Sequence, residues 1–185
     1  MTVSWWKPKK NEYTWMLMSI FCFLLPLAGC ANKYRVDLIE KPISNIPATS
    51  HFYIMLSEDG RFEQIVYAGS GQLASSAVHS VLQRNGVKST QASSIQTLAE
   101  ATAEAASVGA DYILQPIILH WEDRATEWSG RPDRITIKYV VVDLKNSEKV
   151  ASMIVSASSK WATLGGDHPQ DLVPKTVQDF IDNVF

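Results

Sequence analysis

The sequence is poor in cysteine. Only Cys22 and Cys30 occur among its 185 residues, and both lie within the first 30. If residues 1–29 are removed during maturation, as the next motif indicates, one cysteine remains at the first position, which excludes an internal disulfide and a cysteine-based metal site. The remaining folded part of roughly 135 residues must rely on its own hydrophobic core, and it is long enough to bury one.

An excess of basic residues is also missing. The net charge is −2, and removal of residues 1–29 takes away three lysines and one glutamate, which leaves −4. Nucleic-acid binding depends on clustered lysine and arginine, so this function class is disfavoured. Apolar residues make up 46% and charged residues 19% of the chain, which is a normal globular balance.

No hydrophobic run is long enough to span a bilayer. Residues 15–29 are almost wholly apolar, but Pro26 interrupts the end of the run, and a spanning helix needs about 20 residues. The run follows a net basic leader, residues 1–14, and precedes small residues. This order predicts an export signal, and an uncleaved signal anchor is the alternative.

The export signal ends in Leu27-Ala28-Gly29-Cys30. This motif resembles the bacterial lipoprotein signal: leucine, two small residues, then cysteine. The resemblance implies that diacylglycerol is attached to the Cys30 thiol, that the Gly29–Cys30 bond is cleaved, and that the freed amine is acylated by a fatty acid such as palmitate. Two or more acyl chains anchor a protein stably. Ala31 stands where an aspartate would retain the protein in the inner membrane, which implies an outer-membrane location facing the periplasm.

Residues 31–50 show no sustained hydrophobic period and contain Pro42 and Pro47, which disfavour regular structure. We interpret residues 30–50 as the lipidated cysteine and a tether. Residues 51–185 are expected to form a single periplasmic domain.

Hydrophobic periodicity in residues 51–185 predicts an α/β domain in the order β-α-β-α-β-β-β-α. Its mixed sheet ends in an antiparallel meander, followed by a C-terminal helix that starts regularly near Asp171 and holds Pro174 in its first turn. Right-handed crossovers are expected to place the first two helices on one face. Pro116 favours an edge position or a bulge. Expected strands cover 51–56, 87–92, 110–124, 134–144 and 150–164, with 62–67 either a strand or an extended loop.

Two passages carry a family resemblance. The helix-to-strand passage "AEAASVGADYILQPIILHW" and the terminal "GGDHPQDLVPKTVQDFIDNVF" resemble a family of small bacterial outer-membrane lipoproteins catalogued only as a domain of unknown function. The resemblance implies fold and location but no activity. More distantly, the order is similar to the lipoprotein activators of penicillin-binding proteins and to the N-terminal domain of the Tol–Pal translocation protein.

Gly69-Ser70-Gly71 begins a G-x-G-x-x-A pattern ahead of the first helix. A dinucleotide site would need a carboxylate about 20 residues further on, and residues 87–94 contain none. The pattern therefore predicts a tight helix entry with Ser70 as N-cap, and no cofactor. Anion binding at this turn, or a small-ligand pocket beside it, stays an alternative.

Motifs for catalysis and metal binding are absent from the sequence. The four histidines, His51, His79, His120 and His168, do not stand at metal-ligand spacing, and no serine lies in a nucleophile motif. We therefore expect no metal, no catalytic residue and no enzymatic activity. An envelope hydrolase whose site is assembled across the fold is the alternative.

Residues 120–134 combine tryptophan and arginine with acidic residues. Tryptophan and arginine often anchor protein interfaces, so this segment predicts partner contacts. The alternative places Trp121 in the core and the charges on a solvated turn. We expect a non-enzymatic adaptor or regulator that is held in the membrane by acyl groups and binds another envelope protein. The candidate contact residues are Trp121, Arg124, Trp128, Arg131 and Arg134.

Overall fold

The computed structural model describes residues 31–39, 46–124, 131–160 and 168–184, all within the compact unit Ala31–Phe185. The lipoprotein motif and Trp128 lie outside the described residues. Among the described residues, no helix is both long and apolar enough to cross a membrane.

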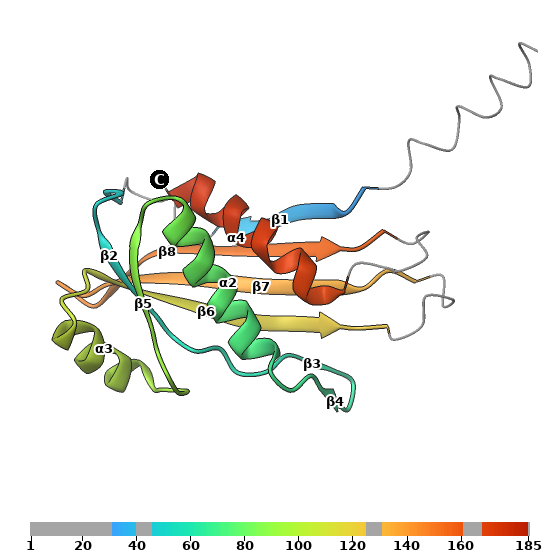
Figure 1. Ribbon diagram of the computed structural model, residues 1–185, viewed down its shortest axis with the longest axis horizontal. Coiled ribbons are helices and arrows are strands. Elements are labelled where there is room, and N and C mark those ends of the chain that lie inside the picture. Colours follow the sequence, from blue (N-terminus) through green and yellow to red (C-terminus); the bar gives the residue numbers. More distant parts are fainter. Residues whose placement is uncertain (1–30, 40–45, 125–130, 161–167, 185) are drawn as a thin grey trace, which may run out of the picture. The chain divides into compact units, whose positions relative to one another are not determined.

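A six-stranded mixed sheet forms the centre of the domain (Figure 1). Its strands lie in the order β1-β8-β7-β6-β2-β5. β2 pairs in parallel with β5 and β6, whereas β6, β7, β8 and β1 are successively antiparallel, so the predicted mixed sheet with a meander is confirmed. The strand bounds are β1 Lys33–Ile39, β2 His51–Ile54, β5 Lys88–Gln91, β6 Tyr112–Glu122, β7 Arg134–Asp143 and β8 Glu148–Ser158.

Three helices and a small hairpin complete the described part of the domain. The helices are α2 Ser70–Arg84, α3 Leu98–Ser107 and α4 Pro169–Val184. The hairpin pairs β3 Arg61–Phe62 with β4 Ile65–Val66, so residues 62–67 contain strand at both ends and a turn between. Pro174 lies in the second turn of α4 rather than in the first, because the helix begins earlier than Asp171.

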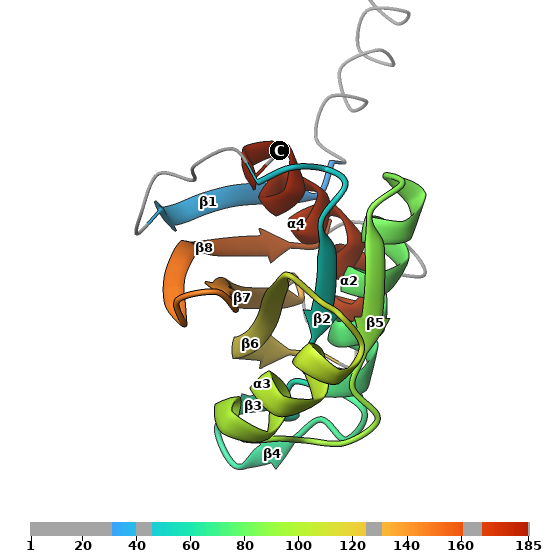
Figure 2. The same ribbon diagram turned by 90° about the vertical axis from the view of Figure 1, so that its left-hand side faces the viewer.

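The first two helices lie on opposite faces of the sheet, so the expectation that they share one face is wrong (Figure 2). Successive residues of a strand point to opposite faces. In β2, Phe52 joins the core packed by α2 and α4, whereas Tyr53 joins the smaller core packed by α3. The reason is the strand order: β5 and β6 flank β2 on its two sides, so the two right-handed crossovers run in opposite directions.

Strand β6 is irregular in its second half. β2 pairs only with residues 112–114 of β6, so Pro116 lies where this strand pairs with β7 alone, the edge situation that proline tolerates. Further on, the pairing with β7 shifts by one residue between Ile118 and His120. This bulge at Leu119 re-aims the side chains that follow it. As a result Trp121 faces the main core while His120 and Glu122 face the other side of the sheet.

Residues 33–39 were expected to belong to a tether, but they form a strand of the sheet. They form β1, which pairs with β8 along its length and has Tyr34 packed against the main core. The strand lies at the sheet edge and exposes Val36, and the tether interpretation rested on Pro42 and Pro47, which come after it. Backbone pairing with β8 and the packing of Tyr34 hold it in place.

Candidate functional site

Two rows of polar side chains cross four strands at the end of the sheet where β1 begins. We call this the Lys33 end of the sheet. Residues paired across neighbouring strands point to the same face, and alternate residues of one strand share a face. By strand register, one row is Lys33, Ser158, Arg134 and Glu122, and the next is Arg35, Ser156, Thr136 and His120. Both rows lie on the face that α3 covers elsewhere.

The members of these rows other than Glu122 line a groove of about 580 Å³, which we call the basic groove. Its charged members are Lys33, Arg35 and Arg134, together with His120, and no carboxylate is among the described residues that line it. Between the basic side chains stand the hydroxyls of Thr136, Ser156 and Ser158. The groove therefore offers N–H and O–H donors in a domain whose overall charge is negative.

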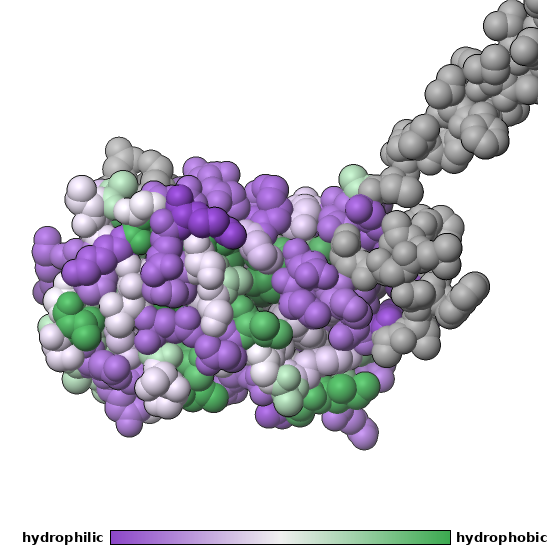
Figure 3. Space-filling model, viewed as in Figure 1, coloured by the Kyte–Doolittle hydropathy of each residue, from purple (hydrophilic) through white to green (hydrophobic). Residues whose placement is uncertain are grey.

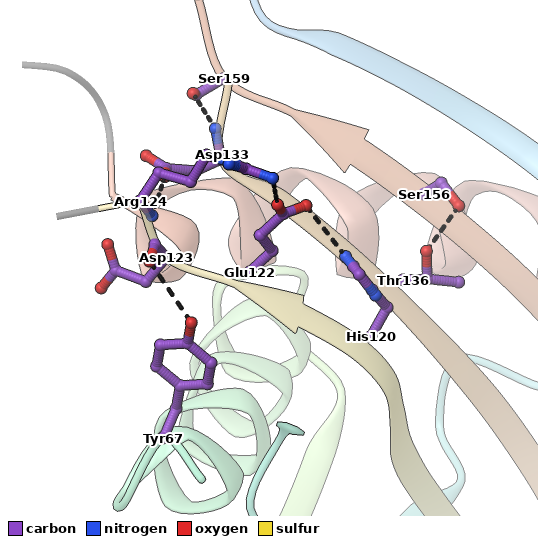
Figure 4. Close-up of polar contacts among 9 residues, drawn as sticks. All are labelled: Tyr67, His120, Glu122, Asp123, Arg124, Asp133, Thr136, Ser156 and Ser159. Carbon is purple, nitrogen blue, oxygen red and sulfur yellow. Dashed lines mark hydrogen bonds and ion pairs between the residues drawn. The ribbon is translucent and has the colours of Figure 1, made fainter. Parts of the chain in front are cut away.

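Hydrogen bonds among the hydroxyls hold the floor of the basic groove. Thr136 Oγ1 and Ser156 Oγ are 2.9 Å apart (Figure 4). Ser156 Oγ also donates to Asp37, which accepts the Arg35 guanidinium as well. Asp37 sits at the bulge in β1. Asp37 therefore balances Arg35, and the charge that remains for a ligand comes from Lys33 and Arg134.

A buried carboxylate lies beneath one end of the basic groove. Glu122 is 3% exposed, and it interacts with His120 Nε2 at 3.3 Å and with the guanidinium of Arg124 (Figure 4). His120 makes an edge contact with the Phe62 ring at 5.2 Å, and Arg124 lies 5.9 Å above the same ring. A buried carboxylate requires charged or hydrogen-bonding partners, and His120 and Arg124 supply them to Glu122. Because both side chains also contact Phe62, they join the β3–β4 hairpin to the Lys33 end of the sheet.

Asp133 closes the loop between β6 and β7. Its Oδ1 accepts the Arg124 amide at 2.6 Å, and its own amide donates to Ser159 Oγ at 2.9 Å. Burial raises the pKa of the Asp133 carboxyl above its ordinary value, and the bond from the Arg124 amide opposes that rise. The bonds fix both ends of the connection whose middle, residues 125–130, includes Trp128 and lies outside the described residues.

The structure describes four of the five predicted contact residues, all but Trp128, and places them in different surroundings. Trp121 is 2% exposed and packs in the main core, so the prediction of a surface role for it is wrong; the bulge at Leu119 turns it inward. Arg124 is engaged with Glu122, whereas Arg131 and Arg134 are exposed. Only Arg134 lines the basic groove. Lys33 and Arg35 were missed, and the alternation of "KYRVDLI" is the signal that could have revealed their strand.

The glycine turn before α2 is filled by the chain itself. Gly69 is the N-cap, with φ 87°, and Ser70 is the first helical residue rather than the cap. The Gly71 amide donates to the Asp59 carboxylate at 2.9 Å, which occupies the position an external anion would take. A Cβ on Gly71 would lie 2.8 Å from the Glu58 carbonyl oxygen and closer still to that of Ser57. The turn therefore has the tight approach expected from its glycines.

Other histidines contact hydroxyl groups. His51 is buried and bonds Gly109 O at 3.1 Å and Thr90 Oγ1 at 2.9 Å. His79 Nδ1 is 2.9 Å from Ser89 Oγ on the surface. Within the described part of the chain, neither ring is also hydrogen-bonded to a carboxylate, and no group of three metal-ligating side chains gathers. A Ser-His-carboxylate arrangement is therefore not assembled from these residues.

Comparison with solved structures gives a shared fold. PelC from Paraburkholderia phytofirmans, solved as a dodecamer, is 12% identical and matches with a TM-score of 0.61 over 83% of this chain and 97% of that chain. The C-terminal domain of LpoB from Salmonella enterica is 14% identical, with a TM-score of 0.43 over 62% and 86%. The lipoprotein GNA1162 from Neisseria meningitidis is 10% identical, with a TM-score of 0.47 over 73% and 96%.

Comparison of sequences gives the family. No curated protein matches the chain. A model described as "Domain of unknown function (DUF4823)" matches residues 44–184, which includes every described element except β1. This match confirms the resemblance to a family of unknown function that the helix-to-strand and terminal passages indicated. The chain therefore belongs to the DUF4823 family.

Proposed function

We propose that the chain is an outer-membrane lipoprotein whose periplasmic domain works without catalysis, as an adaptor or regulator that binds another envelope protein. The observation that carries the proposal is the continuity between Leu27-Ala28-Gly29-Cys30 and β1, which starts at Lys33. The acylated cysteine would be joined to a folded sheet with only Ala31 and Asn32 between them. A domain anchored this closely is suited to act at the membrane surface.

The partner surface that we propose lies beside α3. Ile95 is 59% and Leu98 is 47% exposed, although both side chains are large and apolar. Next to them is a groove of about 250 Å³ whose walls combine six apolar residues with Ser57, Glu58, Gln96 and Gln115; we call it the apolar groove after its larger side chains. Exposed apolar patches of this kind mark interaction sites. The walls include Met55, Leu56, Ile95, Pro116, Ile117 and Ile118.

Site-directed photo-crosslinking in intact cells tests this role. A crosslinking amino acid at Leu98 is expected to capture one specific envelope protein. The same amino acid at Gln83, which is exposed on α2 across the sheet, is the matched control and should capture none. Equal, diffuse products from both positions would remove the support for an adaptor.

A further inference from the structure

We propose that the basic groove binds the phosphate groups of anionic lipid headgroups in the same leaflet that holds the acyl chains of Cys30. This inference rests on the lipidation of Cys30 proposed above. It assigns the Lys33 end of the sheet to the membrane and leaves the apolar groove beside α3 for the protein partner.

The chain path brings the basic groove to the bilayer. The Lys160 amide donates to Asn32 Oδ1 at 3.1 Å, which ties residue 32 to the end of β8. Consecutive Cα atoms are 3.8 Å apart, so the Cα of Cys30 lies within about 8 Å of that of Asn32. Acyl chains attached to Cys30 therefore enter the membrane next to Lys33, the first residue of β1 and a wall of the groove.

The spacing of the charges suits a phosphate. Lys33 and Arg134 are both paired with Ser158, from opposite sides, and neighbouring strands are about 4.8 Å apart, which places the two Cα atoms about 10 Å apart. Long side chains can converge on one group from that distance. Within the described part of the chain, no ion pair involves Lys33 or Arg134, and Ser158 is paired with both of them. Charge-assisted bonds from such donors are the ones that hold phosphate oxygens.

An apolar element stands at the same end. The β3–β4 hairpin exposes Ile65 by 54% and Val66 by 49%, and Figure 3 shows hydrophobic side chains gathered over β3 and β4. Phe62 fixes the hairpin against His120, a wall of the basic groove. Basic side chains beside exposed apolar ones are the combination that binds the interface of an anionic membrane.

The test uses the mature acylated protein in vesicles. One set consists of phosphatidylethanolamine with about one quarter phosphatidylglycerol, and the other replaces that quarter with phosphatidylcholine. Lysine acetylation is followed residue by residue by mass spectrometry. We expect Lys33 to react about five-fold more slowly in the anionic vesicles, the effect of roughly one membrane-bound charge. Lys88, exposed on the far edge strand β5, should react equally in both.

Two charge-reversal variants distinguish lipid binding in the basic groove from a general electrostatic effect of the anionic membrane surface. Arg134→Glu should abolish the protection of Lys33. Arg84→Glu makes the same charge change in the exposed last turn of α2, outside both the groove lining and the hairpin, and should leave the protection in place. Melting curves establish that both variants are folded. Equal Lys33 rates in the two vesicle sets, or equal effects of the two reversals, would overturn the proposal.

Two further measurements show which assumption is wrong if the lipid-binding proposal fails. Inorganic phosphate added to the phosphatidylcholine vesicles should give no protection; full protection would reassign the groove to a free anion and overturn the lipid assignment. Intact mass of the mature N-terminus reports acylation separately. An unacylated Cys30 would contradict the proposed function itself, whereas an acylated chain with an unprotected Lys33 would contradict only the groove assignment.

Discussion

The Arg124 guanidinium is ion-paired with the Glu122 carboxylate, and Glu122 is 3% exposed. A carboxylate taken out of water is tolerated when its charge is compensated. Arg124 also lies over the Phe62 ring. One side chain thus neutralises the end of β6 and helps to seat the β3–β4 hairpin.

Removal of this guanidinium should destabilise the domain. In Arg124→Ala the buried Glu122 keeps, among the described residues, the His120 contact alone. We therefore expect the free energy of unfolding to fall by about 1–3 kcal/mol, less than for a fully buried pair because Arg124 is partly exposed. Urea denaturation measures the change. Arg131→Ala, in an exposed arginine nearby, is the control, with an expected loss below about 0.5 kcal/mol. Equal falls in the free energy of unfolding for the two variants would show that the Arg124–Glu122 ion pair does not contribute to stability.

Gly71 and Gly86 make a matched pair for the entry and exit of α2. An added Cβ at Gly71 meets the backbone oxygens of Ser57 and Glu58, whereas at Gly86 it meets nothing within 4 Å, although φ is +74°. Gly71→Ala should cost about 3 kcal/mol or more through overpacking against backbone, and Gly86→Ala about 1 kcal/mol through the left-handed conformation. Denaturation midpoints in the reverse order would contradict this close approach.

Tyr53 should make the domain sensitive to alkali. Burial raises its pKa to about 12, and Glu104 adds to the rise; an unfolded tyrosine titrates near about 10. Below the lower value both states are protonated, so this residue has no effect on the pH dependence. Between the two values only the unfolded chain loses the proton, so the free energy of unfolding falls as pH rises.

The Tyr53→Phe variant checks that linkage. It should flatten the fall by up to about 1.4 kcal/mol per pH unit. Buried Tyr139, whose pKa is also raised by burial, keeps a residual slope. Urea denaturation across this alkaline window gives the slopes, and identical slopes for wild type and variant would mean that Tyr53 ionises as easily in the fold as outside it.

Cys30→Ser should block maturation. Without the thiol no diacylglycerol can be attached, so we expect the chain to keep residues 1–29 and to lose its acyl mass. Mass spectrometry of the purified protein reads both changes together. A wild-type mature chain that begins at any residue other than Cys30 would contradict the lipoprotein assignment.

Patterns that a strand or helix carries within itself were predictable from the sequence. In β7, Ile135, Ile137, Tyr139 and Val141 alternate into the main core, and the short turns between the last three expected strands indicated the meander. Capping also followed local rules: Thr97 and Glu100 form a capping box at the start of α3. Such features depend on neighbours a few residues apart.

Features that depend on distant pairing were not predictable. The basic groove exists because residues 33, 158 and 134 stand side by side in register, and no local pattern encodes that register. The helices α2 and α3 cover opposite faces of the sheet because β5 and β6 pair with β2 on its two sides. Trp121 was a candidate contact residue with the core as the alternative, and the structure supports the alternative; the choice depends on a one-residue bulge at Leu119, which shifts the later side chains to the other face.

The pairing of β1 with β8 has a consequence for the timing of biogenesis. Lys33 pairs with Ser158, so the earliest strand of the domain has no partner in the sheet until the last strand has been synthesised. Contacts of such long sequence separation form late and slowly. In the lipoprotein proposed above, the segment that follows Cys30 would stay unpaired during that interval and open to the enzymes that attach the lipid and cleave the signal. Pairing of β1 with β8 then completes the sheet.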